Sequence, residues 1–290
     1  LLCYRRQRQM CIRDRSEAVL HVVATPIGNM EDITLRALRV LAEVDVIAAE
    51  DTRHTGRLLS HHGIDAPLLA LHEHNEEKVT QRLLDRLNAG EAIALVSDAG
   101  TPLLSDPGFR LVRAAAEADI TISAIPGPSA ITAALSICGV ATDRFSFEGF
   151  LPQKQSARIR FLSSLRDEQR TMVLFESSHR IMASLHDMES VLGAGRKAAI
   201  CREMTKKFET VLRGSLAGLR SQLEDDPNQR KGEFVLVLSG CEHDYPAAFG
   251  RAVELASALQ DHLTSSQAAR VAAKVCGVSR RELYNQLTQE

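Results

Sequence analysis

The sequence predicts an α/β fold of two domains followed by a small helical module. The chain has 290 residues, a length that exceeds one minimal domain and suits two compact ones. Short apolar runs alternate with segments of helical spacing, which is typical of βαβ units and a mostly parallel sheet. After Pro246 the composition changes to helix-forming segments with capping signals.

The composition is that of an ordinary globular chain, with 44% apolar and 25% charged residues. No apolar run approaches the roughly 18 residues that a membrane span needs, so no membrane partner is expected. Aromatic residues make up 4% of the chain and Trp is absent. A broad base-stacking platform is therefore not predicted.

Residues 1–15 differ from the rest of the chain, because they hold five Arg, one Asp and two of the six Cys. They lack the apolar core and small-residue cleavage site of a secretory signal, and they resemble translated adapter sequence. We interpret them as non-native and leave them out of the fold prediction. The remaining residues carry a net charge of −6, which argues against coating nucleic acid by bulk charge.

No metal or disulfide is predicted from the cysteines and histidines. Cys138, Cys201, Cys241 and Cys276 are widely spaced without a C-x-x-C pair, so the expected compartment is a reducing cytoplasm. Histidines gather in one stretch, at His54, His61, His62, His72 and His74. A metal would also require a third ligand and supporting partners, so a polar cleft rim is the favoured interpretation.

Residues 16–138 are predicted to form an N-terminal parallel α/β domain. Its buried strands are expected at Leu20–Thr25, Val46–Glu50, Leu68–Leu71, Ala92–Asp98 and Ile120–Ile125. A helix with apolar positions from Ile33 to Val44 follows the possible cap Asp32. Ligands of such sheets bind outside the carboxyl ends of the strands.

Residues 139–242 are predicted to form a second domain that begins after a hinge near Gly139–Asp143. A helix is expected from Ser178. Strands are expected at Thr171–Glu176, Ala198–Arg202, Glu209–Arg213 and Glu233–Ser239. Because strands outnumber helices here, we expect a mixed sheet.

Residues 243–290 are predicted to form the helical module. Thr264-x-x-Gln267 and Ser279-x-x-Glu282 fit the capping-box signature, and a helix from near Ser265 is expected to end at Gly277. This is helix-turn-helix spacing. A three-helix packing unit is the alternative that spacing alone leaves open.

Chemistry is expected in four loops that follow predicted strands. They are TPIGN (Thr25–Asn29), EDTR (Glu50–Arg53), SDAGTPLLSDPG (Ser97–Gly108) and PGPSA (Pro126–Ala130). None is a G-x-G-x-x-G or Walker-type loop, so no dinucleotide or nucleoside-triphosphate site is predicted. For EDTR, a structural salt-bridged turn is the alternative.

The third loop is the most informative. Asp98 at a strand end is placed to accept hydrogen bonds from ribose hydroxyls, and Gly100 lets a ligand approach the backbone. A helix is expected to begin near Asp106. In the fourth loop, Ser129 is expected either to cap a helix or to touch a ligand.

Together these loops resemble the ribosomal RNA branch of the tetrapyrrole methylase superfamily. The resemblance covers Leu20 to about Gly240 and rests on the ordered motifs TPIGNMEDITLRA, AEDTR, SDAGTPLLSDPG, PGPSA, FEGFLP, FESSHR and GEFVLV. It implies a two-domain class III methyltransferase fold, S-adenosylmethionine bound between the domains, and a homodimer. It also implies 2′-O-methylation of a cytidine in the decoding region of 16S rRNA in the small ribosomal subunit.

The resemblance also implies site residues. For the cofactor these are Ile27, Asp98, Gly100, Thr101, Ser129, Ala130, Glu176, Glu203 and Gly232. A weakly acidic 2′-hydroxyl calls for a base or a nearby cation, and the candidates are Glu50, Asp51, Glu176, Glu203 and Lys206. RNA contacts are expected from Arg53, Lys154, Arg158, Arg160, Arg180 and Lys206, with a merely solvated surface as the alternative for each.

Other functions remain open at this point. Porphyrin-modifying relatives carry G-x-G-P-G-D where this chain has ATPIGN, which favours RNA over a tetrapyrrole or corrin substrate. The chain could also be a non-catalytic nucleic-acid-binding protein that uses its helical module. A metal-dependent phosphoesterase is the remaining alternative, but the chain lacks a spaced ligand set.

Overall fold

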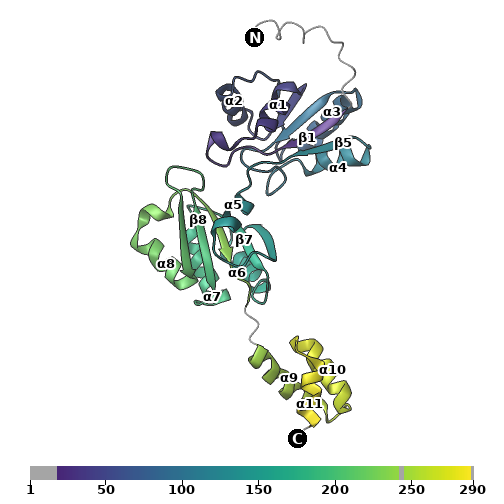
Figure 1. Ribbon diagram of the computed structural model, residues 1–290, viewed down its shortest axis with the longest axis vertical. Helices are drawn as coiled ribbons and strands as arrows, with labels where there is room; N and C mark the ends of the chain where they lie inside the picture. The colour runs from purple at the N-terminus through teal and green to yellow at the C-terminus, as the bar shows by residue number, and fades with distance from the viewer. Residues whose placement is uncertain (1–17, 242–244, 289–290) are drawn as a thin grey trace. The chain divides into compact units, whose positions relative to one another are not determined.

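The computed structural model describes residues 18–241 and 245–288 (Figure 1). They fall into two compact units. The larger unit comprises the described residues up to Arg166 together with Thr171–Ser239, and the smaller unit comprises Asp167–Arg170 and the described residues from Gly240 onward. The predicted non-native segment, residues 1–15, lies outside the described residues.

The larger unit begins with a five-stranded sheet in the order β3-β2-β4-β1-β5, in which every pair is parallel. The prediction of a parallel sheet is confirmed. The strands are β1 (Val19–Val23), β2 (Val46–Ala49), β3 (Leu68–Ala70), β4 (Ala92–Val96) and β5 (Thr121–Ile125).

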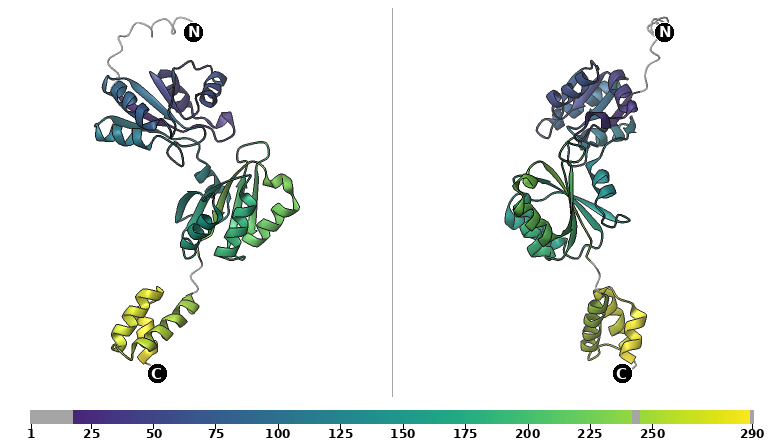
Figure 2. Two further views of the ribbon diagram at one scale, coloured as in Figure 1. Left: turned by 180° about the vertical axis from the view of Figure 1, so that it is seen from behind. Right: turned by 60° about the vertical axis from the view of Figure 1, so that its left-hand side comes forward.

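Helices cover both faces of this sheet (Figure 2). Helices α1 (Leu35–Glu43) and α2 (Thr52–His61) pack on one face, and α3 (Glu76–Asn88) and α4 (Phe109–Glu117) pack on the other. Because side chains alternate along a strand, Ile47 belongs to the first core while Val46 belongs to the second. This double burial explains why the strands read as unbroken apolar runs.

The strand order places the carboxyl ends of β1 and β4 side by side. The chain after β1 and the chain after β4 are also bonded to each other, because Thr25 and Gly100 exchange backbone hydrogen bonds of 2.9 and 3.0 Å. Along the chain, β4 comes after β3 and before β5. In the sheet, β3 and β4 lie on one side of β1, whereas β5 lies on the other side. Such a crossing point is where parallel sheets bind ligands.

A second five-stranded sheet has the order β6-β7-β10-β8-β9 and is mixed, as predicted. Its strands are β6 (Phe145–Phe150), β7 (Thr171–Ser177), β8 (Lys197–Arg202), β9 (Thr210–Ser215) and β10 (Glu233–Leu238). Only β6 and β7 run parallel. Strand β6 was not among the predicted strands. Its register shifts between Phe147 and Gly149, which breaks the alternation expected of a strand.

The two faces of the second sheet have different cover. Helices α6 (Gln155–Ser164), α7 (Ile181–Leu192) and α8 (Leu216–Asp225) form one core with it. Helix α5 (Ala130–Ile137) packs on the opposite face, where its Ile131 and Ala134 meet Val173 and Val235. The amino-terminal end of α5 therefore lies next to the second sheet.

Three predicted helix starts were wrong. Helix α7 begins at Ile181 rather than at Ser178, since residues 178–180 form a turn. Helix α1 begins at Leu35, because Thr34 caps it by accepting from the Ala37 amide at 3.1 Å, whereas Asp32 ends a short 3-10 turn. Helix α4 begins at Phe109 rather than near Asp106. Pro107 disfavours helical backbone at the residue before it, which keeps Asp106 in the loop.

The smaller unit consists of helices α9 (Tyr245–Leu259), α10 (Ser265–Cys276) and α11 (Arg280–Thr288). An alanine-rich core joins them, with Ala252, Ala268 and Leu283 fully buried. The capping box at Thr264 and Gln267 is confirmed, and Gly277 ends α10 with a φ of +66°. Among residues 18–241 and 245–288, no helix is long and apolar enough to cross a membrane.

Candidate ligand-binding site

A cavity of about 490 Å³ lies in the larger unit, where the carboxyl ends of the first sheet face the second sheet. Its first wall comes from the loops after β1, β2, β4 and β5. Its second wall comes from β6, β7, β10 and the loop after β8. The side chains and backbone that line it include Ile27, Glu50, Asp98, Gly100, Thr101, Ser105, Asp106, Ser129, Ala130, Phe150, Phe175, Glu176, Met204, Gly232 and Glu233.

Three carboxylates gather at the first wall. The amide of Asp51 donates to Asp98 Oδ1 at 3.0 Å, and the amide of Asp98 donates to Glu50 Oε2 at 3.4 Å. Burial raises the pKa of Asp106 to about 6, assisted by the Asp98 carboxylate and opposed by a hydrogen bond with Ser97. Burial, Asp106 and Asp98 raise the pKa of Glu50 in the same way. In the described part of the chain, no group of three metal-ligating side chains is placed to hold a metal ion.

The loops of the first wall are bonded to one another. Thr101 Oγ1 donates to the Pro128 carbonyl at 3.1 Å, which joins the loop after β4 to the loop after β5. Gly100 has a φ of +79°, and a Cβ there would lie 3.3 Å from Ile27 Cγ2. Ser129 occupies the N-cap position of α5 without a side-chain capping bond, and it lines the cavity.

The opposite wall is largely apolar. The rings of Phe150 and Phe175 meet edge to face with centroids 5.5 Å apart, and Met204, Phe234 and Val235 continue the surface. The cavity thus combines an acidic side with an apolar side. Such a lining suits a ligand that carries both positive charge and apolar parts.

Strained backbone borders the cavity. Five non-glycine residues in the described ranges have a positive φ. Four of them, Leu103, Ser105, Glu203 and Thr205, belong to the loops after β4 and β8. Because such conformations persist only where the surroundings enforce them, both loops are held in fixed shapes.

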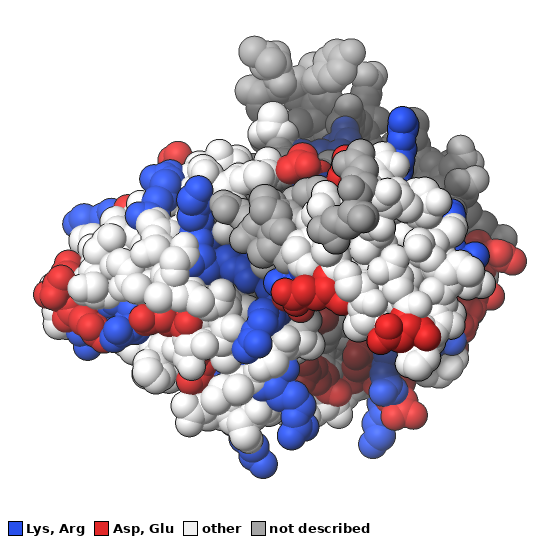
Figure 3. Space-filling view, turned by 90° about the horizontal axis from the view of Figure 1, so that it is seen from below, with Lys and Arg blue, Asp and Glu red and all other residues white. Residues whose placement is uncertain are grey.

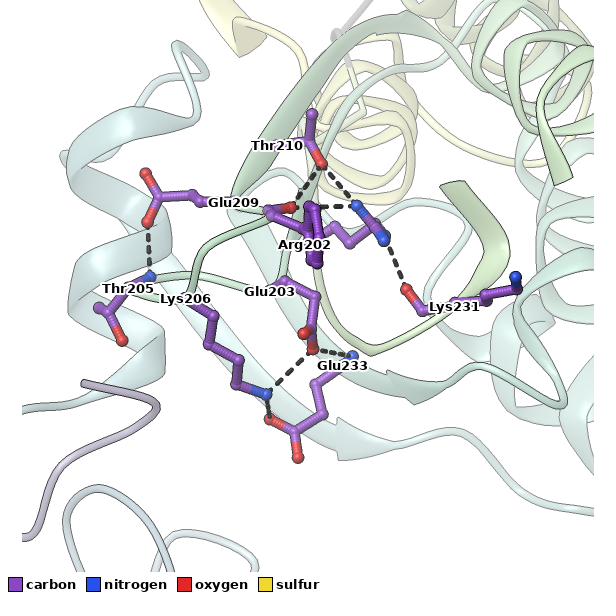
Figure 4. Close-up of polar contacts among 9 residues, drawn as sticks. Arg202, Glu203, Thr205, Lys206, Glu209, Thr210, Lys231 and Glu233 are labelled. Carbon is purple, nitrogen blue, oxygen red and sulfur yellow. Dashed lines mark hydrogen bonds and ion pairs between the residues drawn. The ribbon is translucent and has the colours of Figure 1, made fainter. Parts of the chain in front are cut away.

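The structure brings most of the predicted cofactor residues together. Eight of them line the cavity: Ile27, Asp98, Gly100, Thr101, Ser129, Ala130, Glu176 and Gly232. Glu203 lies behind Gly232 instead. Its carboxylate accepts from the Glu233 amide at 2.9 Å and from Lys206 Nζ at 3.0 Å (Figure 4).

The five candidate catalytic residues differ in whether their side chains face the cavity or are engaged by other residues. Glu50 faces the cavity. Asp51 caps α2 and pairs with Arg53 at 2.8 Å, which is the structural turn left open above. Lys206 pairs with Glu203 and with Glu233 at 2.8 Å, so neither it nor Glu203 is free for the reaction.

Glu176 borders the cavity, but its carboxylate is buried and fully engaged. Ser184 Oγ donates to it at 2.6 Å, the Ser177 amide donates at 2.8 Å, and Arg180 pairs with it at 2.7 Å. The Glu176 carboxylate therefore links β7 to α7, and these contacts do not suit a group that accepts a proton in the reaction.

The RNA contact predicted for Arg158 is contradicted. Arg158 is 4% exposed, and its guanidinium pairs with buried Asp187 at 2.7 Å. The sequence placed it in a basic segment, but its position on α6 turns it toward α7. Lys154 and Arg160, from the same segment, are exposed.

The other predicted RNA contacts are partly occupied. Arg180 is held by Glu176 and donates to the Leu151 carbonyl at 2.8 Å, while Arg53 is exposed but paired with Asp51. On the face drawn in Figure 3, Lys and Arg side chains lie among Asp and Glu side chains. That face is therefore not uniformly basic.

Sequence reasoning missed Asp106 as a site residue. The available signal was the second Asp of SDAGTPLLSDPG, in a motif already singled out. It was assigned to a helix start, which hid its place in a turn between Ser105 (φ +74°) and Gly108 (φ +116°).

The fold and cavity define a two-domain methyltransferase of the tetrapyrrole methylase type. The family described as Tetrapyrrole (Corrin/Porphyrin) Methylases matches residues 19–220, and the RsmI C-terminal HTH domain matches residues 247–289. The chain belongs to the tetrapyrrole methylase family. The helical module is thus similar to a helix-turn-helix domain, and its three helices pack around one core.

Within this family, the chain is similar over most of its length to ribosomal RNA methyltransferases, as two relatives show. "Ribosomal RNA small subunit methyltransferase I" of Xylella fastidiosa (strain Temecula1) is 51% identical over 91% of this chain and 97% of its own length. The protein of the same name from Escherichia coli O157:H7 is 48% identical over 93% of this chain and 95% of its own.

Solved structures share the fold at low identity. The uroporphyrin-III-C-methyltransferase of Thermus thermophilus is 21% identical with a TM-score of 0.53, over 77% of this chain and 94% of that one. The methyltransferase CobJ is 17% identical with a TM-score of 0.58, also over 77% and 94%.

Proposed function

We propose that this protein is an S-adenosylmethionine-dependent methyltransferase that transfers a methyl group to a ribose 2′-hydroxyl of 16S rRNA in the small ribosomal subunit. The observation that carries the proposal is near-complete coverage, at 51% identity, of a relative named as a ribosomal RNA small subunit methyltransferase. The cytidine of the decoding region is the target implied by the resemblance.

The polar groups of the cavity suit S-adenosylmethionine. The cofactor is a cation with ribose hydroxyls, and the first wall offers carboxylates together with close backbone at Gly100. Asp98 Oδ2 accepts no hydrogen bond from the described residues and would be open to a hydroxyl. The residues that would hold the cofactor are the eight cavity-lining ones named above. When bound, the cofactor supplies an electrophilic methyl group.

The chain itself would supply orientation and a proton acceptor. Fixing a hydroxyl against an electrophile removes several kcal/mol of barrier in favourable cases. Glu50 and Asp106 are the carboxylates at the cavity whose pKa is raised by burial. Asp106, with its pKa raised to about 6, is deprotonated at neutral pH yet accepts a proton readily, so we assign the acceptor role to Asp106.

RNA binding would involve exposed cations and the helix-turn-helix domain. Lys154 and Arg160 lie exposed on the α6 segment. Phosphate contacts from such residues give salt-sensitive binding. The ribosomal substrate would place the reaction in the cytoplasm. We further infer a homodimer, as the resemblance implies, which light scattering would test.

The direct test is transfer of radiolabelled methyl groups to three acceptors in parallel. These are undermethylated small ribosomal subunits, naked rRNA and uroporphyrinogen. Labelling of the subunits or of the rRNA, with the modified ribose mapped afterwards, is the expected result. Labelling of uroporphyrinogen alone would establish the tetrapyrrole alternative instead.

A further inference from the structure

The loop between β8 and β9 (Glu203–Glu209) presents an aromatic ring to solvent beside a cation. Phe208 is 64% exposed, and Lys207 Nζ lies 5.6 Å from the centroid of its ring. An aromatic ring next to a basic side chain is the usual means of holding an unpaired base together with its phosphate. Single exposed apolar residues are common, so the case depends on how the loop is built.

The backbone that carries Phe208 is held in place by several hydrogen bonds (Figure 4). Two turns follow one another, with the Lys206 amide bonded to the Glu203 carbonyl at 3.0 Å and the Glu209 amide bonded to the Lys206 carbonyl at 3.1 Å. The Thr205 amide donates to Glu209 Oε2 at 2.5 Å.

The buried side chain of Arg202 holds the loop in place through hydrogen bonds. It is 9% exposed, and its guanidinium donates to the Phe208 carbonyl at 3.0 Å, to Thr210 Oγ1 at 3.0 Å and to the Lys231 carbonyl at 2.6 Å. The exposed ring therefore stands on an ordered support. A preorganised contact loses less entropy when a partner binds.

The charges of the loop balance in number, since exposed Glu209 offsets Lys207, but the two side chains differ in their contacts: Glu209 accepts from the Thr205 amide. Glu203 and Glu233 neutralise Lys206, and Arg202 is used inside the loop. Lys207 is exposed and makes no ion pair with the described residues. The ammonium group beside the aromatic ring is therefore available to a phosphate.

The loop also borders the cavity. Its Met204 lines the cavity, as does Glu233, the partner of Lys206. On its other side the loop abuts the turn after β1, since a Cβ at Gly28 would lie 2.6 Å from Lys206 Cγ. Four residues reach at most about 14 Å, so Phe208 lies within that distance of the cavity wall at Met204.

We propose that Phe208 and Lys207 form a stacking contact for an unpaired base of the RNA substrate, next to the nucleotide that enters the cavity. The ring takes the base and the ammonium takes its phosphate. This inference rests on the proposed function and adds to it the substrate element that positions the target ribose.

The test compares four full-length variants: Phe208→Ala, Phe208→Trp, Lys207→Ala and Phe109→Ala. Phe109 is the matched control, because it is 65% exposed and lies at the start of α4, outside the cavity lining. The measurements are KM for undermethylated small subunits across a salt series, Kd for S-adenosylmethionine by calorimetry, Tm, and mass in solution.

Loss of one stacked base should raise KM for the subunits about 10-fold in Phe208→Ala. Phe208→Trp should restore it, and Lys207→Ala should raise KM and lower the salt dependence by about one phosphate contact. Kd for the cofactor should stay unchanged in all four variants. Phe109→Ala should resemble the unmodified protein.

Three results would overturn the inference. One is a KM in Phe208→Ala that matches that of Phe109→Ala. The second is a loss of cofactor affinity in Phe208→Ala as large as the rise in its KM for the subunits, which would mean a structural role for the ring. The third is a change of mass in solution, which would assign Phe208 to self-association. If the unmodified protein labels rRNA, each of these outcomes removes only the stacking contact, whereas labelling of uroporphyrinogen alone removes the proposed function as well.

Discussion

Gly232 lies directly against the side chain of Glu203. A Cβ at position 232 would come within 2.5 Å of Glu203 Cγ and Cδ, and the φ of Gly232 is +100°. Glu203 in turn holds Lys206 and the Glu233 amide. One glycine at the cavity wall therefore sets the shape of the loop after β8.

We expect Gly232→Ala to weaken binding of S-adenosylmethionine and to lower stability, because backbone strain and the clash with Glu203 act together. Strain alone costs on the order of 1–3 kcal/mol. The matched control is Gly193→Ala, whose φ is +99° with nothing within 4 Å of the added Cβ. Calorimetric Kd and Tm measure both effects, and an equal loss in the two variants would show that the Glu203 contact is immaterial.

Arg158→Ala should destabilise the protein strongly rather than weaken RNA binding. Removal of the guanidinium leaves Asp187 as a buried, unpaired charge, which costs about 3–5 kcal/mol. Arg160→Ala, on the exposed side of the same helix, should change the unfolding free energy by less than about 0.5 kcal/mol. Urea unfolding of both variants checks this, and equal midpoints would contradict the structural role of Arg158.

The rate of methyl transfer should rise with pH through about 6 and then level off. Asp106, with its pKa raised to about 6, must lose its proton before it can accept another. Asp106→Asn should lower the single-turnover rate about 10²- to 10⁴-fold and remove this pH step. Its cofactor Kd should remain measurable, and a pH profile identical to that of the unmodified protein would exclude Asp106 as acceptor.

The stability of Asp106→Asn should change with pH in a defined direction. A carboxyl group whose pKa is raised on folding stabilises the protein below its unfolded pKa of about 3.8, and this stability is lost as pH rises through about 6. The Asn variant lacks the buried charge, so above pH 6 it should be the more stable protein. Thermal unfolding at pH 5 and pH 8 measures the sign.

Thr264→Ala should destabilise the helical module by about 1 kcal/mol, because Thr264 Oγ1 accepts from the Gln267 amide in the capping box. The cavity that we propose for the cofactor belongs to the larger unit, so Kd for S-adenosylmethionine should not change. Hydrogen exchange of the α10 amides reports the loss, and unaltered protection of those amides would argue against the cap.

Most of the architecture followed from the sequence because local patterns carry it. The apolar runs form the parallel strands β1 to β5, and the mixed second sheet was predicted from its strand content. Thr264 and Gly277 cap the two ends of α10, as predicted. Strand β6 was missed because its register shifts between Phe147 and Gly149, which interrupts its alternation.

The sequence by itself determined which loops meet at the cavity. These loops carry Gly, Pro and Asp directly after buried strands, and the carboxyl ends of parallel strands lie at one edge of the sheet. Only the tertiary structure decided which charges are available there. Arg158, Glu176 and Lys206 all occur in motifs that suggest chemistry, yet each is neutralised by a partner from a different element or turn. Asp106 shows the reverse case, since the burial near Asp98 that raises its pKa depends on residues that only folding brings together.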